Sequence, residues 1–368
     1  MGRLRFAVAV AVGLATAVAG VRALQPGDGR VRVALTLDAQ AIEVSYSPAL
    51  SAADSAHAAL LSGSIGASAP VGALTADSTL RIGSIAYDVD APRAPAPPGA
   101  PPPRVSYDLW LARTADGWEL EARGGGDTGV VPLTHRTVAD PAPTLGFSLH
   151  AIGAETGRLY LRWGPHVWSA EFRFDDLPPQ PQQLPGSGGF GEALQRDSDT
   201  SATARANRLA ERNETALALP DGARIVVLYG KHLPVDGVDY PNLPATPDGA
   251  VVELLRAPAL RIRSDVALRF GQTDLPTANL APGFAGLYAL WLKRAGDGWR
   301  IVFNDEPDSW GTQHDPAFDA AEVAVEYARA DGGFRPLGVT LVPTGADGGR
   351  LVVHWGPHEW AADFVIVR

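Results

Sequence analysis

Apolar and polar residues alternate with a period of two along much of this chain. The alternation is clear in residues 31–37, 145–151 and 168–174, as expected for half-buried β-strands. Clusters of Asp and Gly at 114–117 and 295–298 separate neighbouring segments and suit tight hairpins. Many short segments of this kind follow one another with hardly any helical pattern. The sequence therefore predicts an all-β protein built from antiparallel sandwiches or barrels.

One six-residue string occurs twice. Residues 163–168 read WGPHVW and residues 355–360 read WGPHEW, an offset of 192. Upstream of these, residues 106–122 match residues 287–303 at an offset of 181. Two shorter matches precede them in the same order, at offsets of 180 and 183. The constant order indicates a tandem duplication whose period is too long for a solenoid, so each copy is expected to be a domain.

The duplication divides the chain into segments of different expected structure. Residues 24–177 (copy 1) and 220–368 (copy 2) are expected to form two tandem antiparallel β-sandwich-like domains. Residues 178–219 begin with a tract rich in Pro, Gln and Gly, which is typical of a linker. Residues 200–219 have a helix-forming composition and predict one short helix before copy 2. A Pro-rich tract at 91–103 predicts an extended surface loop within copy 1.

The two copies differ most between their second and third matching segments. The offset rises there from 181 to 192, so copy 2 carries extra residues. Its longer stretch includes residues 304–319, NDEPDSWGTQHDPAFD, where copy 1 has the dissimilar residues 123–140. A specialised role for one copy is therefore expected in this region.

Residues 1–23 have the pattern of an export signal. Two arginines precede an apolar run from Phe6 to Val21, and cleavage after Ala19 or Ala23 fits a secretory signal peptide. The run spans about 24 Å, which is shorter than the hydrocarbon core of roughly 30 Å. A retained membrane anchor is the alternative, because Arg22 can reach the membrane interface. Either alternative predicts an extracytoplasmic, periplasmic body, soluble or tethered by its N-terminal helix.

Charge and cysteine content narrow the functional classes. The net charge of −10 argues against binding to phosphate backbones, so no nucleic-acid partner is expected. The chain has no cysteine, which excludes disulfides, thiolate metal sites and cysteine nucleophiles. Residues 186–191 match a dinucleotide-binding pattern, but they follow a proline tract instead of a strand. No cofactor is therefore expected.

Copy 2 carries several motifs in a fixed order from about residue 283. They occupy residues 286–291, 299–304 and 310–315, followed by Asp319, Leu351 and residues 355–356. With these motifs copy 2 resembles the bacterial domain-of-unknown-function family 2911, and the similarity before residue 283 is weak. Copy 1 is similar to a diverged member without the Trp310 segment. The resemblance implies an extracytoplasmic β-rich domain and brings no activity or catalytic residue with it.

The repeated Trp-Gly-Pro-His-x-Trp motif has two interpretations. Gly-Pro is a turn signal, and both flanking segments alternate as buried strands do, which favours a duplicated structural corner with core tryptophans. The alternative is an aromatic surface for a sugar or small ligand. The residues considered for such a ligand site in copy 2 are Trp310, His314, Asp315 and Trp360.

A metal site is a further hypothesis. Three imidazoles, His314, His354 and His358, could form a zinc set with Asp315. Copy 1 has Arg162 in the place of His354, and the Gly-Pro break need not keep His354 and His358 on one face. The acidic residues of 304–319 lack the alternation of a calcium-binding EF-hand loop, so an ordered surface loop pinned by Trp310 is favoured there.

Three functional hypotheses follow. The first is a non-catalytic extracytoplasmic binding or scaffolding protein. In this hypothesis its partners are other proteins, for example as a membrane-extrinsic accessory subunit that braces a respiratory or photosynthetic complex. The second is a small-ligand or glycan-binding protein. The third is a metal-dependent hydrolase centred on copy 2.

Overall fold

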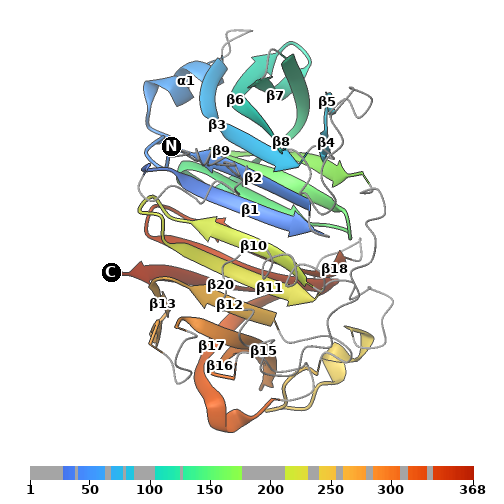
Figure 1. Cartoon of the computed structure of the whole chain (residues 1–368), viewed down its shortest axis with the longest axis vertical. Helices are drawn as coiled ribbons and strands as arrows, with labels where there is room; N and C mark the ends of the chain where they lie inside the picture. The colour runs from blue at the N-terminus through green and yellow to red at the C-terminus, as the bar shows by residue number, and fades with distance from the viewer. Residues whose placement is uncertain are drawn as a thin grey trace, which may run out of the picture.

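The computed structural model describes residues 28–37, 40–62, 68–77, 80–86, 104–124, 127–175, 212–230, 240–253, 260–278, 285–306, 314–329 and 335–368. Most of these residues form β-strands, which confirms the all-β prediction. Antiparallel pairings connect twenty strands into one large sheet network (Figure 1). One short α-helix and two 3-10 helices, η1 (Tyr240–Ala245) and η2 (Pro316–Phe318), complete the described elements.

The first half of the chain holds nine strands and the α-helix. They are β1 (Val31–Leu37), β2 (Gln40–Tyr46), α1 (Ser55–Leu61), β3 (Ser68–Asp77), β4 (Leu80–Ile82), β5 (Ile85–Ala86), β6 (Arg104–Thr114), β7 (Gly117–Gly124), β8 (Asp127–Ala151) and β9 (Thr156–Phe174). Strands pair in the order β1–β2–β3–β6–β7–β8. The long β8 then pairs with β9, which also pairs with β4. Strand β8 therefore connects two layers of strands.

The second half holds eleven strands. They are β10 (Arg212–Ala218), β11 (Arg224–Gly230), β12 (Leu260–Ser264), β13 (Ala267–Phe270), β14 (Thr273–Leu275), β15 (Leu287–Ala295), β16 (Gly298–Asn304), β17 (Asp319–Arg329), β18 (Arg335–Pro343), β19 (Gly348–Gly356) and β20 (His358–Val367). Their pairings run β10–β11–β12–β15–β16–β17, followed by β17–β20, β20–β19 and β19–β18. This order is that of the first half, with β17 and β18 in the place of β8, and β19 and β20 in the place of β9.

The two halves meet in both layers. In one layer β1 pairs with β10, with Ala34 opposite Ala216 at the centre of the ladder, and Figure 1 shows the two strands side by side. In the other layer β8 packs against β18. Buried side chains of both halves belong to one continuous apolar cluster. The described residues therefore form one connected body.

Strand β10 corrects the expected structure of the linker. Residues 200–219 predicted a helix from composition, but residues 212–218 form a strand. This strand lies between β1 and β11, and its side chains from Asn213 to Ala218 are buried. Ladder hydrogen bonds on both edges and burial on both faces outweigh a weak helix propensity. The second half therefore begins earlier than residue 220.

The Gly-Pro turns confirm the prediction of a structural corner. Trp355 pairs with His358 across Gly356 and Pro357, so β19 and β20 form a hairpin with a two-residue loop. Gly356 has φ 58° and Gly164 has φ 61°, and glycine at the first loop position with positive φ suits a type II′ turn. In the first half β9 folds back in the same way, because the Phe174 amide donates to the Glu155 carbonyl at 2.9 Å.

The four tryptophans of the two motifs fill the core. Their exposed fractions are 0% for Trp163, Trp168 and Trp360, and 1% for Trp355. The hypothesis that Trp360 belongs to a solvent-exposed surface for a ligand is therefore wrong.

Several expectations lie outside the described residues. They concern the export segment at 1–23, the Pro-rich tract at 91–103, most of the linker, and Trp310. Among the helices of the described residues, none is long and apolar enough to cross a membrane.

Replacing a motif tryptophan will destabilise the protein strongly. We expect Trp163→Ala and Trp355→Ala each to lower the free energy of unfolding by about 3–5 kcal/mol, because each leaves a large cavity in the core. Guanidinium unfolding followed by fluorescence and circular dichroism measures the loss. Val365→Ala, at a side chain that is 50% exposed, is the control and should change stability by less than about 1 kcal/mol. If the tryptophan variants and the control lost the same free energy of unfolding, the burial of these tryptophans in the core would be contradicted.

Candidate functional site

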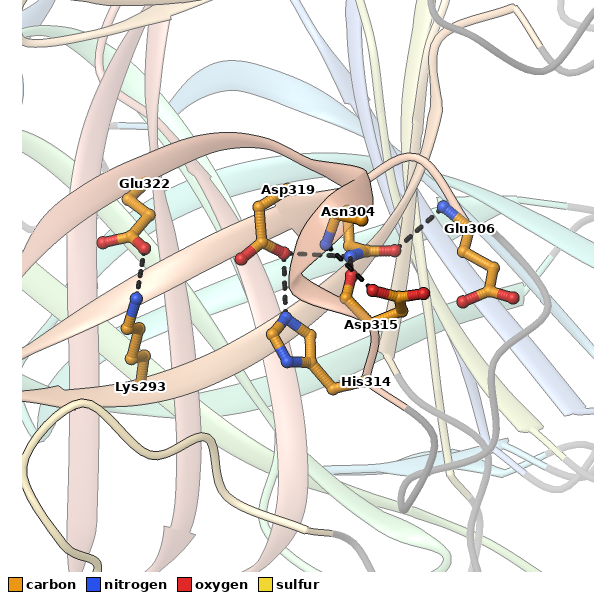
Figure 2. A network of polar contacts seen from close by, with 8 residues as sticks. Lys293, Asn304, Glu306, His314, Asp315, Asp319 and Glu322 are labelled. Atoms are coloured by element: carbon orange, nitrogen blue, oxygen red, sulfur yellow. Dashed lines mark hydrogen bonds and ion pairs between the residues drawn. The ribbon is translucent and has the colours of Figure 1, made fainter.

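The extra segment of the second half is held by a buried asparagine at the end of β16. Asn304 is fully buried, and its side-chain amide donates to the Asp315 carbonyl and to Asp319 Oδ1, both at 2.9 Å (Figure 2). Its Oδ1 accepts from the Glu306 amide at 2.9 Å. One side chain thus contacts both ends of the segment. Trp310 lies outside the described residues, so the expectation that it pins this loop stays a prediction. Asn304 holds the described ends of the segment through Glu306, Asp315 and Asp319.

His314 completes this network. Its Nε2 lies 2.8 Å from Asp319 Oδ1, the same oxygen that Asn304 contacts. The imidazole stands edge-on to the Trp291 ring, with centroids 5.2 Å apart. Trp291 is buried with Ala289 and Val302 in a small apolar cluster separate from the main core. His314 therefore helps to cover an apolar patch on the outer face of β15 and β16.

The acidic side chains around His314 have structural partners. Asp315 Oδ1 accepts from the Ala317 amide at 2.9 Å and caps η2, as an aspartate at a helix start commonly does. Glu322 forms an ion pair with Lys293 beside Asp319 (Figure 2). This pair is partly exposed and contributes little stability. The network can orient the His314 imidazole for proton transfer, but its hydrogen bonds serve to fix the loop.

The three histidines of the hypothetical metal set do not come together. In the described part of the chain, no group of three or more His, Asp or Glu side chains could hold a metal ion. Trp355 pairs with His358 and His354 pairs with Glu359 in the β19–β20 hairpin. Because paired residues share a face and successive residues alternate, His354 and His358 point to opposite faces. The prediction of a zinc site in copy 2 is therefore wrong, and the hydrolase hypothesis loses the metal site on which it depended.

His358 belongs to a stack of rings that we call the C-terminal ring cluster. The cluster consists of Arg294, Trp299, Tyr327, His358 and Trp360. Tyr327 Oη lies 2.7 Å from His358 Nδ1, and the two rings stack with an interplanar angle of 23°. Trp299 meets Trp360 edge-to-face at 5.5 Å, and the Arg294 guanidinium lies 5.3 Å from the Trp299 ring. Tyr327 is 42% exposed, so the cluster reaches the surface.

The first half contains the same arrangement, which we call the N-terminal ring cluster. It consists of Arg113, Trp118, His135, His166 and Trp168. His135 and His166 stack with an interplanar angle of 23° and centroids 5.1 Å apart, and Trp118 meets Trp168 edge-to-face at 5.1 Å. The Arg113 guanidinium lies 5.5 Å from the Trp118 ring. His135 thus stands where the second half has Tyr327.

The histidine pair of this cluster was missed in the sequence. His135 Nε2 lies 2.9 Å from His166 Nδ1, and His57 of α1 lies with its centroid 6.0 Å from that of His166. Burial lowers the pKa of both His135 and His166, with further contributions from Arg113 at His135 and from His135 and His57 at His166. The sequence could have indicated this position, because the residue numbers of His135 and Tyr327 differ by 192, which is also the offset between the two tryptophan motifs.

Two other histidines lie where the halves meet. The His354 ring packs over Gly338, and neither of its nitrogens has a hydrogen bond of normal geometry. Burial is the main cause that lowers its pKa to about 3, and Arg335 and His150 lower it further. The pKa of His150 is also lowered to about 3, first by burial and then by Arg335 and Arg158. Ser148 Oγ lies 3.0 Å from His150 Nε2. Both imidazoles are neutral at pH 7.

A cleft of about 150 Å³ opens beside this contact. Its walls come from β2, β8 and β9 and from the β18–β19 turn, and they include Tyr46, Asp140, Ser148, Arg162 and Pro343. Arg162, the counterpart of His354, donates from Nη2 to the Asp140 carbonyl at 3.0 Å. Arg162 and His354 therefore occupy matching positions but make different contacts.

Comparison with protein-family models, curated proteins and solved structures gives no match to this chain. The resemblance of copy 2 to family 2911 stays a prediction.

Removing the Asn304 amide will loosen the extra segment. We expect Asn304→Ala to lower the free energy of unfolding by about 1–3 kcal/mol, because buried partners lose their hydrogen bonds. Limited proteolysis should then cut within residues 305–318 faster than in the wild type. The matched control is Arg123→Ala, at the equivalent but exposed position of the first half. Unchanged proteolysis in Asn304→Ala would contradict the pinning role.

His150 and His354 make the free energy of unfolding depend on pH. The folded pKa values near 3 lie below the ordinary value of 6.5, so the unfolded chain binds more protons between these limits. Stability should therefore fall as the pH falls from about 6.5 towards 3, by up to about 1.4 kcal/mol per pH unit for each histidine. Denaturant unfolding from pH 7 to pH 4 measures this slope. His354→Leu should flatten it, and an unchanged slope would contradict the assignment.

Proposed function

We propose that this chain is a non-catalytic binding and scaffolding protein that acts outside the cytoplasm. One observation carries the proposal: two equivalent ring clusters, each with an arginine, occur in one connected body. Strands β7 and β16, which carry Trp118 and Trp299, lie toward opposite ends of the molecule (Figure 1). A rigid body with similar surfaces at both ends suits a protein that holds partners at a fixed separation.

The chemistry of the ring clusters favours protein partners. Tyr and Arg are among the side chains that contribute most to protein interfaces. Tyr327 and Arg113 are the exposed members of the two clusters. Tyr327 is held by its hydrogen bond to His358, so little further order is lost when a partner covers it. Large exposed apolar side chains of the described residues, Phe318, Tyr327 and Val365, all belong to the second half. We place the main partner contact at Tyr327, which is the one of the three that belongs to a ring cluster.

The proposed setting is a membrane complex on the outer side of the membrane. The export pattern of residues 1–23 supports this location, either as a cleaved signal or as a tether. The acidic body without cysteine suits a membrane-extrinsic subunit, which could brace a respiratory or photosynthetic assembly. Removing residues 1–24 without loss of assembly would argue against the tether and leave the scaffolding role in place.

We also propose that the two halves arose by tandem duplication of one β-sandwich-like unit. The recurring order of strand pairings supports this origin. The ring clusters recur position for position, at an offset of 181 for Arg113 and Trp118 and of 192 for the other three members. The Phe172 ring covers Gly157, and the Phe364 ring covers Gly349 in the same way. Membership of copy 2 in family 2911 is part of this proposal.

Partner binding should depend on the exposed members of the ring clusters. We expect Tyr327→Ala to reduce at least about tenfold the yield of membrane subunits that co-purify with the full-length protein from solubilised native membranes. Arg113→Ala tests the other end. Val365→Ala is the control, because Val365 is exposed but belongs to neither cluster. Quantitative mass spectrometry of co-purifying chains is the measurement, and a chain recovered alone from wild-type membranes would overturn the scaffolding role.

A further inference from the structure

The histidine pair of the N-terminal ring cluster has the geometry of a chelate. His135 and His166 come from the paired strands β8 and β9, and the Thr137–His166 and His135–Trp168 pairings fix their backbones. Their facing nitrogens, Nε2 and Nδ1, are 2.9 Å apart. A metal ion with bonds of about 2.0–2.1 Å separates neighbouring ligand nitrogens by about 2.9 Å at a right angle and about 3.3 Å at a tetrahedral angle. The nitrogens already have the separation of a chelate, and rotation of both rings would turn their lone pairs from one another toward a common ion.

The protonation state of the pair is compatible with metal binding. Only one hydrogen can lie between the two nitrogens, so one ring donates and the other accepts. The lowered pKa values keep both imidazoles neutral near pH 7. When an ion binds, the donor ring takes its other tautomer, and both facing nitrogens then offer a lone pair without net proton release. Both side chains are only partly buried, so an ion and its waters can reach them.

The surroundings select the kind of ion. Arg113 lies near His135 and disfavours a cation that would be held by charge alone. Within the described residues no carboxylate joins the pair to make a group of three ligands. His57 lies close to His166, but the three rings do not converge on one point. Two imidazoles suit copper(II), zinc or nickel, whereas magnesium and calcium require oxygen ligands.

We propose that His135 and His166 form a binding site for one borderline transition-metal ion, copper(II) or zinc, with water in the remaining positions. The proposal is independent of the scaffolding role. The second half supplies an internal comparison, because the same fold positions there hold Tyr327 and His358. A protonated phenol oxygen is a much poorer ligand for copper(II) or zinc than an imidazole nitrogen, so the C-terminal ring cluster should not bind the ion.

The test is a calorimetric titration of the full chain, without a histidine tag, with copper(II) and separately with zinc. We expect one ion per chain, and His135→Gln and His166→Gln should each weaken binding by roughly tenfold or more. His358→Gln is the matched control at the equivalent motif position and should leave the affinity unchanged. Magnesium should produce no binding isotherm. In the copper complex, electron paramagnetic resonance should show coupling to two imidazole nitrogens.

A gain-of-site variant keeps the test decisive even if a histidine variant folds poorly. Tyr327→His places a second imidazole beside His358, so the number of bound ions should rise from one to two. An unchanged affinity in His135→Gln and His166→Gln would overturn the proposal. So would a wild-type chain that binds no more ion than the double variant, or a Tyr327→His chain whose stoichiometry does not increase.

Discussion

The Gly-Pro turn between the two tryptophans of each motif determines most of what surrounds it. Glycine with positive φ and proline with its fixed φ fold the strand back over two residues. The register of the hairpin then follows, and with it the face on which each side chain lies. Trp355 and His358 share one face, whereas His354 lies on the other. A single local constraint thus separates two histidines that are four residues apart.

The two faces of this hairpin serve different purposes. One face supplies the buried tryptophan and the histidine of a ring cluster. The other face meets the opposite half through His354, whose ring packs over Gly338 near His150 and Arg335. Because β1 and β10 join the other layer, the halves are fixed relative to one another at both layers. Contacts in both layers therefore hold the two ring clusters in a fixed arrangement.

The sequence predicted local structure better than contacts between distant segments. Alternation identified the strands, and the Gly-Pro signal correctly placed Trp163, Trp168, Trp355 and Trp360 in the core. Strand β10 was missed because its helix-forming composition is overridden by neighbours on both edges. The zinc set failed because spacing along the chain does not reveal hairpin register. Asn304 was not singled out either, since its role depends on segments that fold back onto β16.

The chemical difference between the two halves lies in one ring rather than in the extra segment. Asn304, Asp315 and Asp319 use their polar groups to hold the segment on the sheet, and His314 covers Trp291. The ring clusters instead keep the same 23° stacking while exchanging an imidazole at His135 for a phenol at Tyr327. The two halves therefore share the geometry of the stack and differ in its chemistry. What the stack can bind then depends on that one exchange, which leaves two imidazole nitrogens in the first half and an exposed phenol in the second.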